Sequence, residues 1–182
     1  YGLLLYGFIA GFTSPVSAEI RQCDKEFISS DDSHIVYMGR ISRSIPHIVR
    51  FTYPGVSILA NFEGTSLQMK AKPGSGAFMV EVDDELPYRI NFAENDSIQT
   101  LAEGLPEGTH RVRIMYAIEG YELKPAFKGF YLDKGCRLAE APVLPERRIE
   151  FIGNSITCGY GVESENPSDP FTYETENHLL HN

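Results

Sequence analysis

Arg111-Val112-Arg113-Ile114-Met115-Tyr116-Ala117-Ile118 carries an apolar side chain at every second position. The wholly apolar set consists of Val112, Ile114, Tyr116 and Ile118. Successive side chains of a β-strand point to opposite faces, so this period places one face against a core. Gly120 follows and ends the pattern. The stretch predicts the longest strand of the chain and a fold built mainly from β-structure.

A second alternating stretch covers residues 56–62. Its apolar face comprises Val56, Ile58, Ala60 and Phe62. Glu63-Gly64 predicts a turn into residues 66–70, so the two segments are expected to form a hairpin with one solvated face.

Two further strands are expected downstream. Pro73-Gly74-Ser75-Gly76 predicts a turn before a strand at residues 77–82, which Asp83-Asp84 ends. Residues 128–133 predict another strand, with Phe130 and Leu132 on one side. In all, about eight such segments lie between Ile35 and Leu138, and helical periodicity is nearly absent. The pattern predicts a jelly-roll β-sandwich of two antiparallel sheets over residues 19–138.

Composition narrows the classes of function. The 182 residues are 42% apolar and 23% charged, which excludes a disordered or collagen-like chain. A net charge of −9 repels phosphate backbones and anionic lipids, so neither nucleic acid nor a membrane is an expected partner. The chain has 11 Phe, 10 Tyr and no Trp, a supply typical of β-rich cores and of surfaces that face sugars.

The first 18 residues resemble a secretory leader. An apolar run from Leu3 to Phe12 precedes Val16-Ser17-Ala18, which has the spacing of a signal-peptidase site. The run is too short to span a membrane. We therefore expect residues 1–18 to be a signal peptide, clipped at its start because no Met or basic segment precedes the run, and the mature protein to be secreted.

The three cysteines are Cys23, Cys136 and Cys158, so one of them stays unpaired. Cys23 and Cys136 lie near the two ends of the predicted sandwich, where a bridge between them is possible. No Cys or His spacing matches a metal site, and we expect neither a metal nor a cofactor.

The character of the sequence changes at residues 139–147, which contain Pro142 and Pro145 and predict a linker. Residues 148–153 then have apolar side chains on both faces, as expected of a strand inside a parallel sheet. Gly153-Asn154-Ser155 follows at once, which would place the Ser155 hydroxyl at the carboxyl edge of that sheet. A helix after it would offer backbone N–H groups to an oxyanion, although Asn-Ser is also an ordinary turn or helix-capping pair.

The block from Ile149 to Gly161, with Thr175-Glu176-Asn177 after it, resembles the SGNH or GDSL-type serine hydrolases. Together with the β-sandwich and the proline-containing linker, it resembles carbohydrate esterase family 2 more narrowly. The resemblance implies that Ser155 is the nucleophile and contributes its backbone N–H to the oxyanion hole, with Gly153 and Asn154 shaping the turn. It also implies that residues 148–182 begin an α/β/α hydrolase domain as its first strand, turn and helix, and that this domain is incomplete here.

A serine nucleophile needs a base, usually a histidine. The resemblance places that histidine in a late block that the 182 residues do not include. His34, His47 and His110 fall in the β-region, where a surface or partly buried histidine is expected. His178 and His181 have a spacing of three, but zinc would need further ligands, so solvated or structural roles are expected.

Other polar and aromatic residues have ordinary explanations. Asp31-Asp32 and Asp83-Asp84 fit turns, although paired carboxylates also occur in glycosidases. Aromatic residues that could stack on sugar rings or belong to the core are Tyr53, Tyr88, Tyr121, Phe127 and Tyr131.

Two functions follow from the sequence. The first is a secreted carbohydrate O-acetyl esterase that deacetylates plant polysaccharides such as xylan, its partner being an acetylated oligo- or polysaccharide. The second is a carbohydrate-binding or scaffolding sandwich that performs no catalysis within this chain. Neither specifies an oligomeric state.

Overall fold

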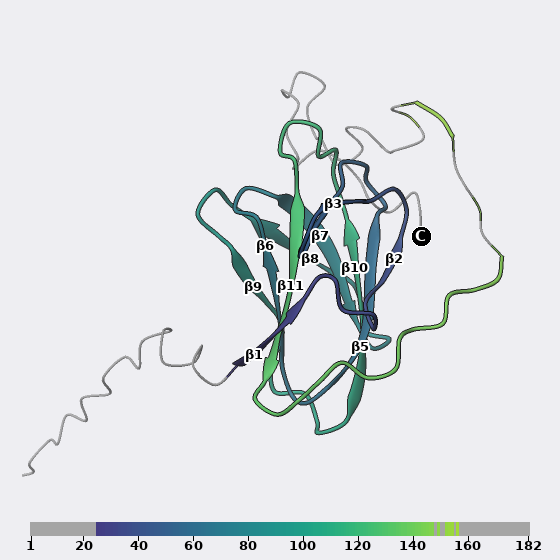
Figure 1. Cartoon of the computed structure of the whole chain (residues 1–182). Helices are drawn as coiled ribbons and strands as arrows, with labels where there is room; N and C mark the ends of the chain where they lie inside the picture. The colour runs from purple at the N-terminus through teal and green to yellow at the C-terminus, as the bar shows by residue number, and fades with distance from the viewer. Residues whose placement is uncertain (1–24, 148, 150–151, 155, 157–182) are drawn as a thin grey trace, which may run out of the picture.

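A computed structural model describes residues 25–147, 149, 152–154 and 156 (Figure 1). Within this part the chain forms two sheets that pack face to face. Sheet A contains β1 (Lys25–Ser29), β3 (Ser42–Ile45), β4 (Ile48–Arg50), β6 (Leu67–Ala71), β9 (Ile98–Ala102) and β11 (Ala126–Asp133). Sheet B contains β2 (Val36–Met38), β5 (Ser57–Glu63), β7 (Gly76–Val82), β8 (Tyr88–Phe92) and β10 (Thr109–Tyr116).

Every strand pairing in these sheets is antiparallel. The strand order is β3-β4-β11-β6-β9 in sheet A, where β1 also pairs with β11, and β2-β5-β10-β7-β8 in sheet B. From β4 to β11 the chain crosses to the other sheet at each connection except that between β7 and β8. This architecture confirms the predicted antiparallel β-sandwich, and the described residues form no helix.

The core between the sheets is rich in aromatic rings. Phe78 of β7 lies at its centre, with ring centroids 5.0 Å from Tyr116, 5.7 Å from Phe92 and 6.1 Å from Phe51. The rings meet mostly edge to face, the arrangement that aromatic quadrupoles favour. Burying such a side chain contributes about 1.5–3 kcal/mol to the stability of the fold.

The strand predicted at residues 111–118 is β10, which lies in the middle of sheet B between β5 and β7. Its predicted apolar face is buried as expected, from Val112 to Ile118. The strand itself runs from Thr109 to Tyr116, two residues earlier at both ends. Ala117 and Ile118 remain buried after the strand pairing stops, so the apolar pattern of the sequence extends past the end of the strand.

The hairpin predicted at residues 56–70 is wrong. The face made by Val56, Ile58, Ala60 and Phe62 is buried, but β5 belongs to sheet B and β6 to sheet A. Gly64 lies between them with a φ of +113°, in the left-handed region that favours glycine. The connection therefore passes from sheet B to sheet A instead of joining two paired strands. The prediction failed because alternation shows which face of a strand is buried but not which strand pairs with it.

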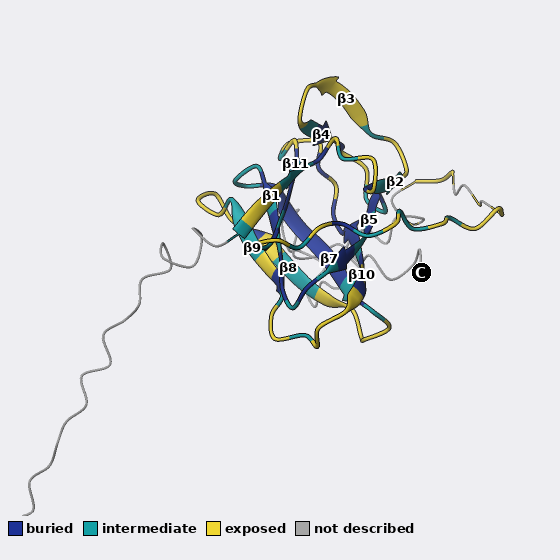
Figure 2. Cartoon of the chain, turned by 60° about the horizontal axis from the view of Figure 1, so that its bottom comes forward, coloured by how far each residue is buried: buried dark blue, intermediate teal, exposed yellow. Residues whose placement is uncertain are grey.

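Eleven strands occur in the described part where about eight were expected. The short β2, β3 and β4 have three or four residues each, too few to show a period. Figure 2 shows β3 exposed along its length. β1 begins ten residues before Ile35, where the predicted strands begin. It pairs with β11, and Lys25 is opposite Asp133.

Residues 139–147, the predicted linker, contain neither helix nor strand. Their first residues lie along β5, where the Ala139 N–H donates to the Asn61 carbonyl at 2.9 Å and the Asn61 side chain donates to the Glu140 carbonyl at 2.8 Å. The strand expected at residues 148–153 is absent from its described positions: Ile149 and Ile152 are 80% and 89% exposed. A strand needs a neighbour to satisfy its backbone, and the described residues provide none there.

Candidate functional site

The turn predicted to carry the nucleophile is described at Gly153, Asn154 and Ile156, all of which are exposed. The Ile156 backbone N–H donates to the Asn154 side-chain oxygen at 3.0 Å. A bond from an Asn side chain to the backbone two residues later is an Asx turn, which imitates a backbone turn. This hydrogen bond lies in the segment where the turn is predicted, between the residues on either side of Ser155.

Several predicted residues lie outside the described part of the chain. These are Ser155, the helix expected after it, Cys158, His178 and His181. The leader at residues 1–18 and Cys23 also lie outside it.

His34 and His47 occupy surface turns, as expected. The His34 ring nitrogen Nδ1 lies 2.7 Å from the Asp32 carboxylate, which also accepts the His34 backbone N–H. The Asp31 carboxylate accepts the His47 backbone N–H at 2.7 Å, and His47 has a φ of 61°. Asp31 and Asp32 thus fix turns, and each histidine is held by a carboxylate close to it.

His110 is the one buried histidine among the described residues. Its Nδ1 lies 2.9 Å from Asp83 Oδ2, and its Nε2 lies 2.8 Å from the Pro106 carbonyl oxygen. Both partners can only accept, so the ring satisfies both when both of its nitrogens carry a proton. The hydrogen bond to Asp83 and that to Pro106 accordingly raise the pKa of His110.

Asp83 combines this contact with the turn predicted after β7. Burial favours its neutral form, but the Arg111 backbone N–H at 2.9 Å and the His110 ring outweigh that effect and lower the pKa of Asp83. Asp83 has a φ of 55°, a conformation that aspartate tolerates better than most residues. The pair closes the end of β7 against β10 and is structural, since neither ring nitrogen of His110 is left to act as a base.

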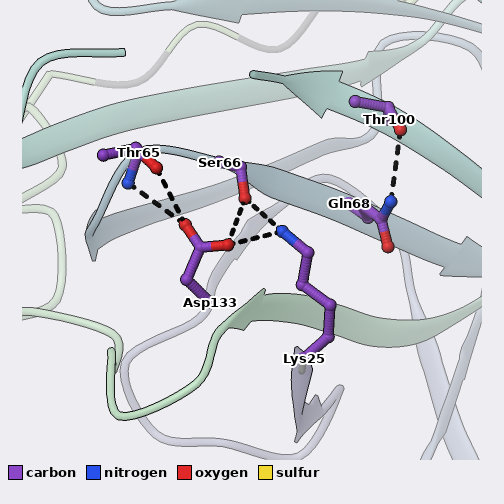
Figure 3. Close-up of polar contacts among 6 residues, drawn as sticks. All are labelled: Lys25, Thr65, Ser66, Gln68, Thr100 and Asp133. Carbon is purple, nitrogen blue, oxygen red and sulfur yellow. Dashed lines mark hydrogen bonds and ion pairs between the residues drawn. The ribbon is translucent and has the colours of Figure 1, made fainter. Parts of the chain in front are cut away.

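A second polar cluster joins three strands of sheet A (Figure 3). Lys25 Nζ lies 2.6 Å from Asp133 Oδ1, and Ser66 Oγ donates to the same oxygen at 2.7 Å. Lys25 also donates to Ser66, while the Thr65 hydroxyl donates to Asp133 Oδ2 at 3.1 Å. Burial opposes the charge of Asp133, but these donors together lower its pKa to about 2. The cluster holds β1 against the sheet.

The five aromatic residues considered as sugar contacts separate into core and surface. Phe127 is fully buried, whereas Tyr53, Tyr88 and Tyr121 are exposed and Tyr131 is half-buried. The Tyr88 hydroxyl donates to the Leu101 carbonyl, and the Arg40 guanidinium lies 5.4 Å from the centre of the Tyr53 ring. Of the four that are not fully buried, only Tyr131 lies beside a second partly exposed ring in the described part, that of Phe27.

The described residues include no group of three His, Cys, Asp or Glu side chains arranged to bind a metal ion. Cys136 forms no disulfide among them, and burial raises the pKa of its thiol. The same part of the chain has no helix with the length and apolar character needed to cross a membrane.

Comparison with known proteins gives a consistent family. The family described as Carbohydrate esterase 2 N-terminal matches residues 37–142. The cellulase/esterase CelE of Acetivibrio thermocellus is 33% identical over 159 residues, which cover 86% of this chain and 19% of that protein. An acetylxylan esterase / glucomannan deacetylase of Cellvibrio japonicus is 31% identical over 138 residues, covering 75% of this chain and 38% of that protein.

Solved structures agree with the sequence matches. A family two carbohydrate esterase from Cellvibrio japonicus superimposes with a TM-score of 0.73 at 27% identity, covering 85% of this chain and 46% of that one. A family two carbohydrate esterase from Clostridium thermocellum, solved in complex with cellohexaose, gives a TM-score of 0.67 at 34% identity, covering 79% and 44%.

The match to CelE reaches beyond the sandwich. A match over 86% of 182 residues leaves at most 26 residues outside it, and 27 residues follow Ser155, so Ser155 lies within it. The chain spans 19% and 38% of the two curated relatives. Because the family match covers more than half of the 182 residues, the chain belongs to the carbohydrate esterase 2 N-terminal family.

Proposed function

We propose that this chain is part of an exported carbohydrate O-acetyl esterase whose nucleophile is Ser155. The observation that carries the proposal is the match to CelE, which includes Ser155 and extends past the linker. The Asx turn between Asn154 and Ile156 supports it, because a nucleophile presented on a sharp turn is accessible to substrate. The predicted leader at residues 1–18 supports export.

The reaction follows from the chemistry of a serine nucleophile. The Ser155 oxygen attacks the acetyl carbonyl carbon while a base takes the hydroxyl proton, giving a tetrahedral oxyanion. The intermediate collapses, the bond to the sugar oxygen breaks, and the base returns the proton to that oxygen. Water then attacks the acetyl-serine by the same route and releases acetate. The Ser155 backbone N–H donates to the oxyanion in both halves of the cycle.

The substrate class comes from the relatives. One is named an acetylxylan esterase / glucomannan deacetylase, and another was solved with cellohexaose. We therefore assign acetylated β-linked plant polysaccharides, xylan or glucomannan, as the substrate of this chain's parent protein.

The base that activates Ser155 is not assigned to any of the described histidines. Among the described histidines, His34 and His110 are held by Asp32 and Asp83, and His47 by Asp31. The relatives are longer than this chain, so we place the histidine base in sequence outside the 182 residues.

The test is a serine substitution in the protein expressed from its whole reading frame. Ser155→Ala is expected to lower acetate release from acetylated xylan, and hydrolysis of 4-nitrophenyl acetate, by about 10⁴-fold or more, because removing a nucleophile leaves only binding and oxyanion stabilisation. Ser44→Ala, on the exposed strand β3, is the control and is expected to retain full activity. Full activity in Ser155→Ala would overturn the assignment.

A further inference from the structure

Four side chains form a row across the outer face of sheet A. They are Phe27 of β1, Tyr131 of β11, Gln68 of β6 and Thr100 of β9, referred to below as the sheet A row. Phe27 is directly opposite Tyr131, Tyr131 is opposite Gln68, and Gln68 is opposite Thr100. With neighbouring strands about 4.8 Å apart, the row is about 14 Å long.

The row faces away from the core. Its flanking residues Phe130 and Leu132 on β11 and Leu67 and Met69 on β6 are buried, so the alternate positions point outward. Phe27 is 42% exposed, Thr100 is exposed, and Tyr131 and Gln68 are half-buried. The row is therefore accessible from solvent at each of its four positions.

One end of the row is an aromatic platform. The Phe27 and Tyr131 rings have centroids 5.0 Å apart, and Lys70 Nζ lies 5.1 Å and 5.5 Å from those centroids. Lys70 Nζ also donates to the Tyr131 hydroxyl at 3.1 Å. Gly129 makes room for this arrangement, since a Cβ there would lie 2.9 Å from the Phe27 ring. The two rings are thus held in place before any ligand arrives.

The other end of the row is polar. The Gln68 amide nitrogen donates to the Thr100 hydroxyl at 3.3 Å (Figure 3). The Gln68 amide oxygen has no partner within the part of the chain that the structure describes, so it is available to accept a hydrogen bond. The sheet A row therefore offers ring faces at one end and an amide and a hydroxyl at the other.

We propose that the sheet A row is a binding site for a neutral β-linked polysaccharide chain. A sugar ring presents C–H groups on its faces and hydroxyls at its edge, so it can stack on Phe27 and Tyr131 while a neighbouring unit bonds Gln68 and Thr100. Lys70, the cation that contacts both rings, is already paired with them and with the Tyr131 hydroxyl, and the chain has a net charge of −9, so an anionic ligand is disfavoured.

A protein partner fits this surface less well. A stable protein interface buries about 800 Å² on each side and has an apolar centre, whereas the sheet A row exposes one ring in part and another less. The linker leaves the surface free, because residues 139 and 140 run along β5 of the opposite sheet. In Figure 1 the chain that follows β11 runs toward β2 and β10, whereas β9 lies on the other side of β11.

The test is a titration of the 182-residue chain with unacetylated xylohexaose, cellohexaose and mannohexaose, followed by calorimetry and by amide NMR spectra. At least one probe is expected to bind and to shift the amide signals of the sheet A row. Tyr131→Ala is expected to weaken that binding about tenfold, since it removes half of the stacking platform. Tyr53→Ala, which removes an exposed ring outside the sheet A row, is the control and is expected to leave binding unchanged.

Gln68→Ala provides a second variant that leaves both rings in place and is expected to weaken binding severalfold. Unfolding curves of each variant show whether a loss of binding reflects a loss of fold. The proposal is overturned when no probe binds at millimolar concentration, or when a probe binds folded Tyr131→Ala and Gln68→Ala as tightly as the parent chain. The probes carry no acetyl group, so either result leaves the esterase proposal standing or falling by its own test.

Discussion

The buried His110 on β10 pairs with the partly exposed Asp83 at the end of β7, and Nδ1 and Oδ2 are 2.9 Å apart. The opposite ring nitrogen lies against the Pro106 carbonyl, so two acceptors stabilise the same imidazolium. The pair also ends β7, because the Asp83 side chain accepts the Arg111 backbone N–H. Asp83 therefore stabilises both the charged form of His110 and the turn that follows β7.

The pair makes the stability of the sandwich dependent on pH. The pKa of His110 is raised by its bond to Asp83, so its stabilising effect is complete below the unfolded value of 6.5 and is lost as the pH rises through the raised value. The pKa of Asp83 is lowered, so its effect is present above 3.8 and is lost as the pH falls. The stabilising effect of the pair is therefore largest between pH 3.8 and pH 6.5, the unfolded values of the two groups.

We expect the free energy of unfolding of the parent chain to fall between pH 6 and pH 8 by more than that of Asp83→Asn. Urea unfolding at the two pH values measures both. Asp83 contacts His110 but neither His34 nor His47, which are held by Asp32 and Asp31, so the difference between the slopes reports on the pair of His110 and Asp83. Equal slopes would show that Asp83 does not control this histidine.

Asp133→Asn is expected to lower the free energy of unfolding at pH 7 by about 1–2 kcal/mol, because it weakens the bonds from Lys25, Ser66 and Thr65 in a partly exposed cluster. Asp84→Asn is the matched control: its side chain is 91% exposed and pairs with Arg111, so a change near zero is expected.

Acid changes the comparison in a defined direction. The pKa of Asp133 is lowered from 3.8 to about 2. Its contribution is therefore complete above pH 3.8 and disappears as the pH falls through about 2. The stability difference between the parent chain and Asp133→Asn should therefore shrink between pH 5 and pH 2. A difference that stays constant over this range would contradict the proposed charge of Asp133.

Gly129→Ala is expected to destabilise the sandwich by about 3 kcal/mol or more, because the new Cβ would lie 2.1 Å from the Ile28 carbonyl oxygen at a φ of +142°. Gly135→Ala also has a positive φ, +84°, but its Cβ would meet nothing within 4 Å, so a loss of about 1 kcal/mol is expected. Thermal unfolding of the two variants measures the contrast. Similar losses would mean that backbone conformation, and not the contact with β1, sets the requirement for glycine.

Alternation was the reliable signal in this sequence. The buried faces of β5, β10 and β11 match the predicted ones, because each strand is long enough for period 2 to show. Pairing was less predictable: β5 and β6 read as a hairpin yet belong to different sheets, since the residues at the turn do not encode the direction of the connection.

The surface features depended on three-dimensional placement. Phe27 was not singled out because β1 precedes the alternating segments, which begin at Ile35, and Gln68 was one polar residue among many in an alternating strand. Only the register that aligns β1, β11, β6 and β9 brings these side chains into one row. The hydrogen bond from Ile156 to the Asn154 side chain, by contrast, joins residues two positions apart and depends on local chemistry alone.

The most direct test of the central claim is to identify the nucleophile by covalent labelling. The protein expressed from its whole reading frame is treated with a serine-directed phosphonate ester and digested, and the modified peptide is sequenced by mass spectrometry. The account predicts a single adduct on Ser155 that forms in step with the loss of acetate release and is blocked by an acetylated oligosaccharide. An adduct on a different residue, or complete inactivation with Ser155 unmodified, would contradict it.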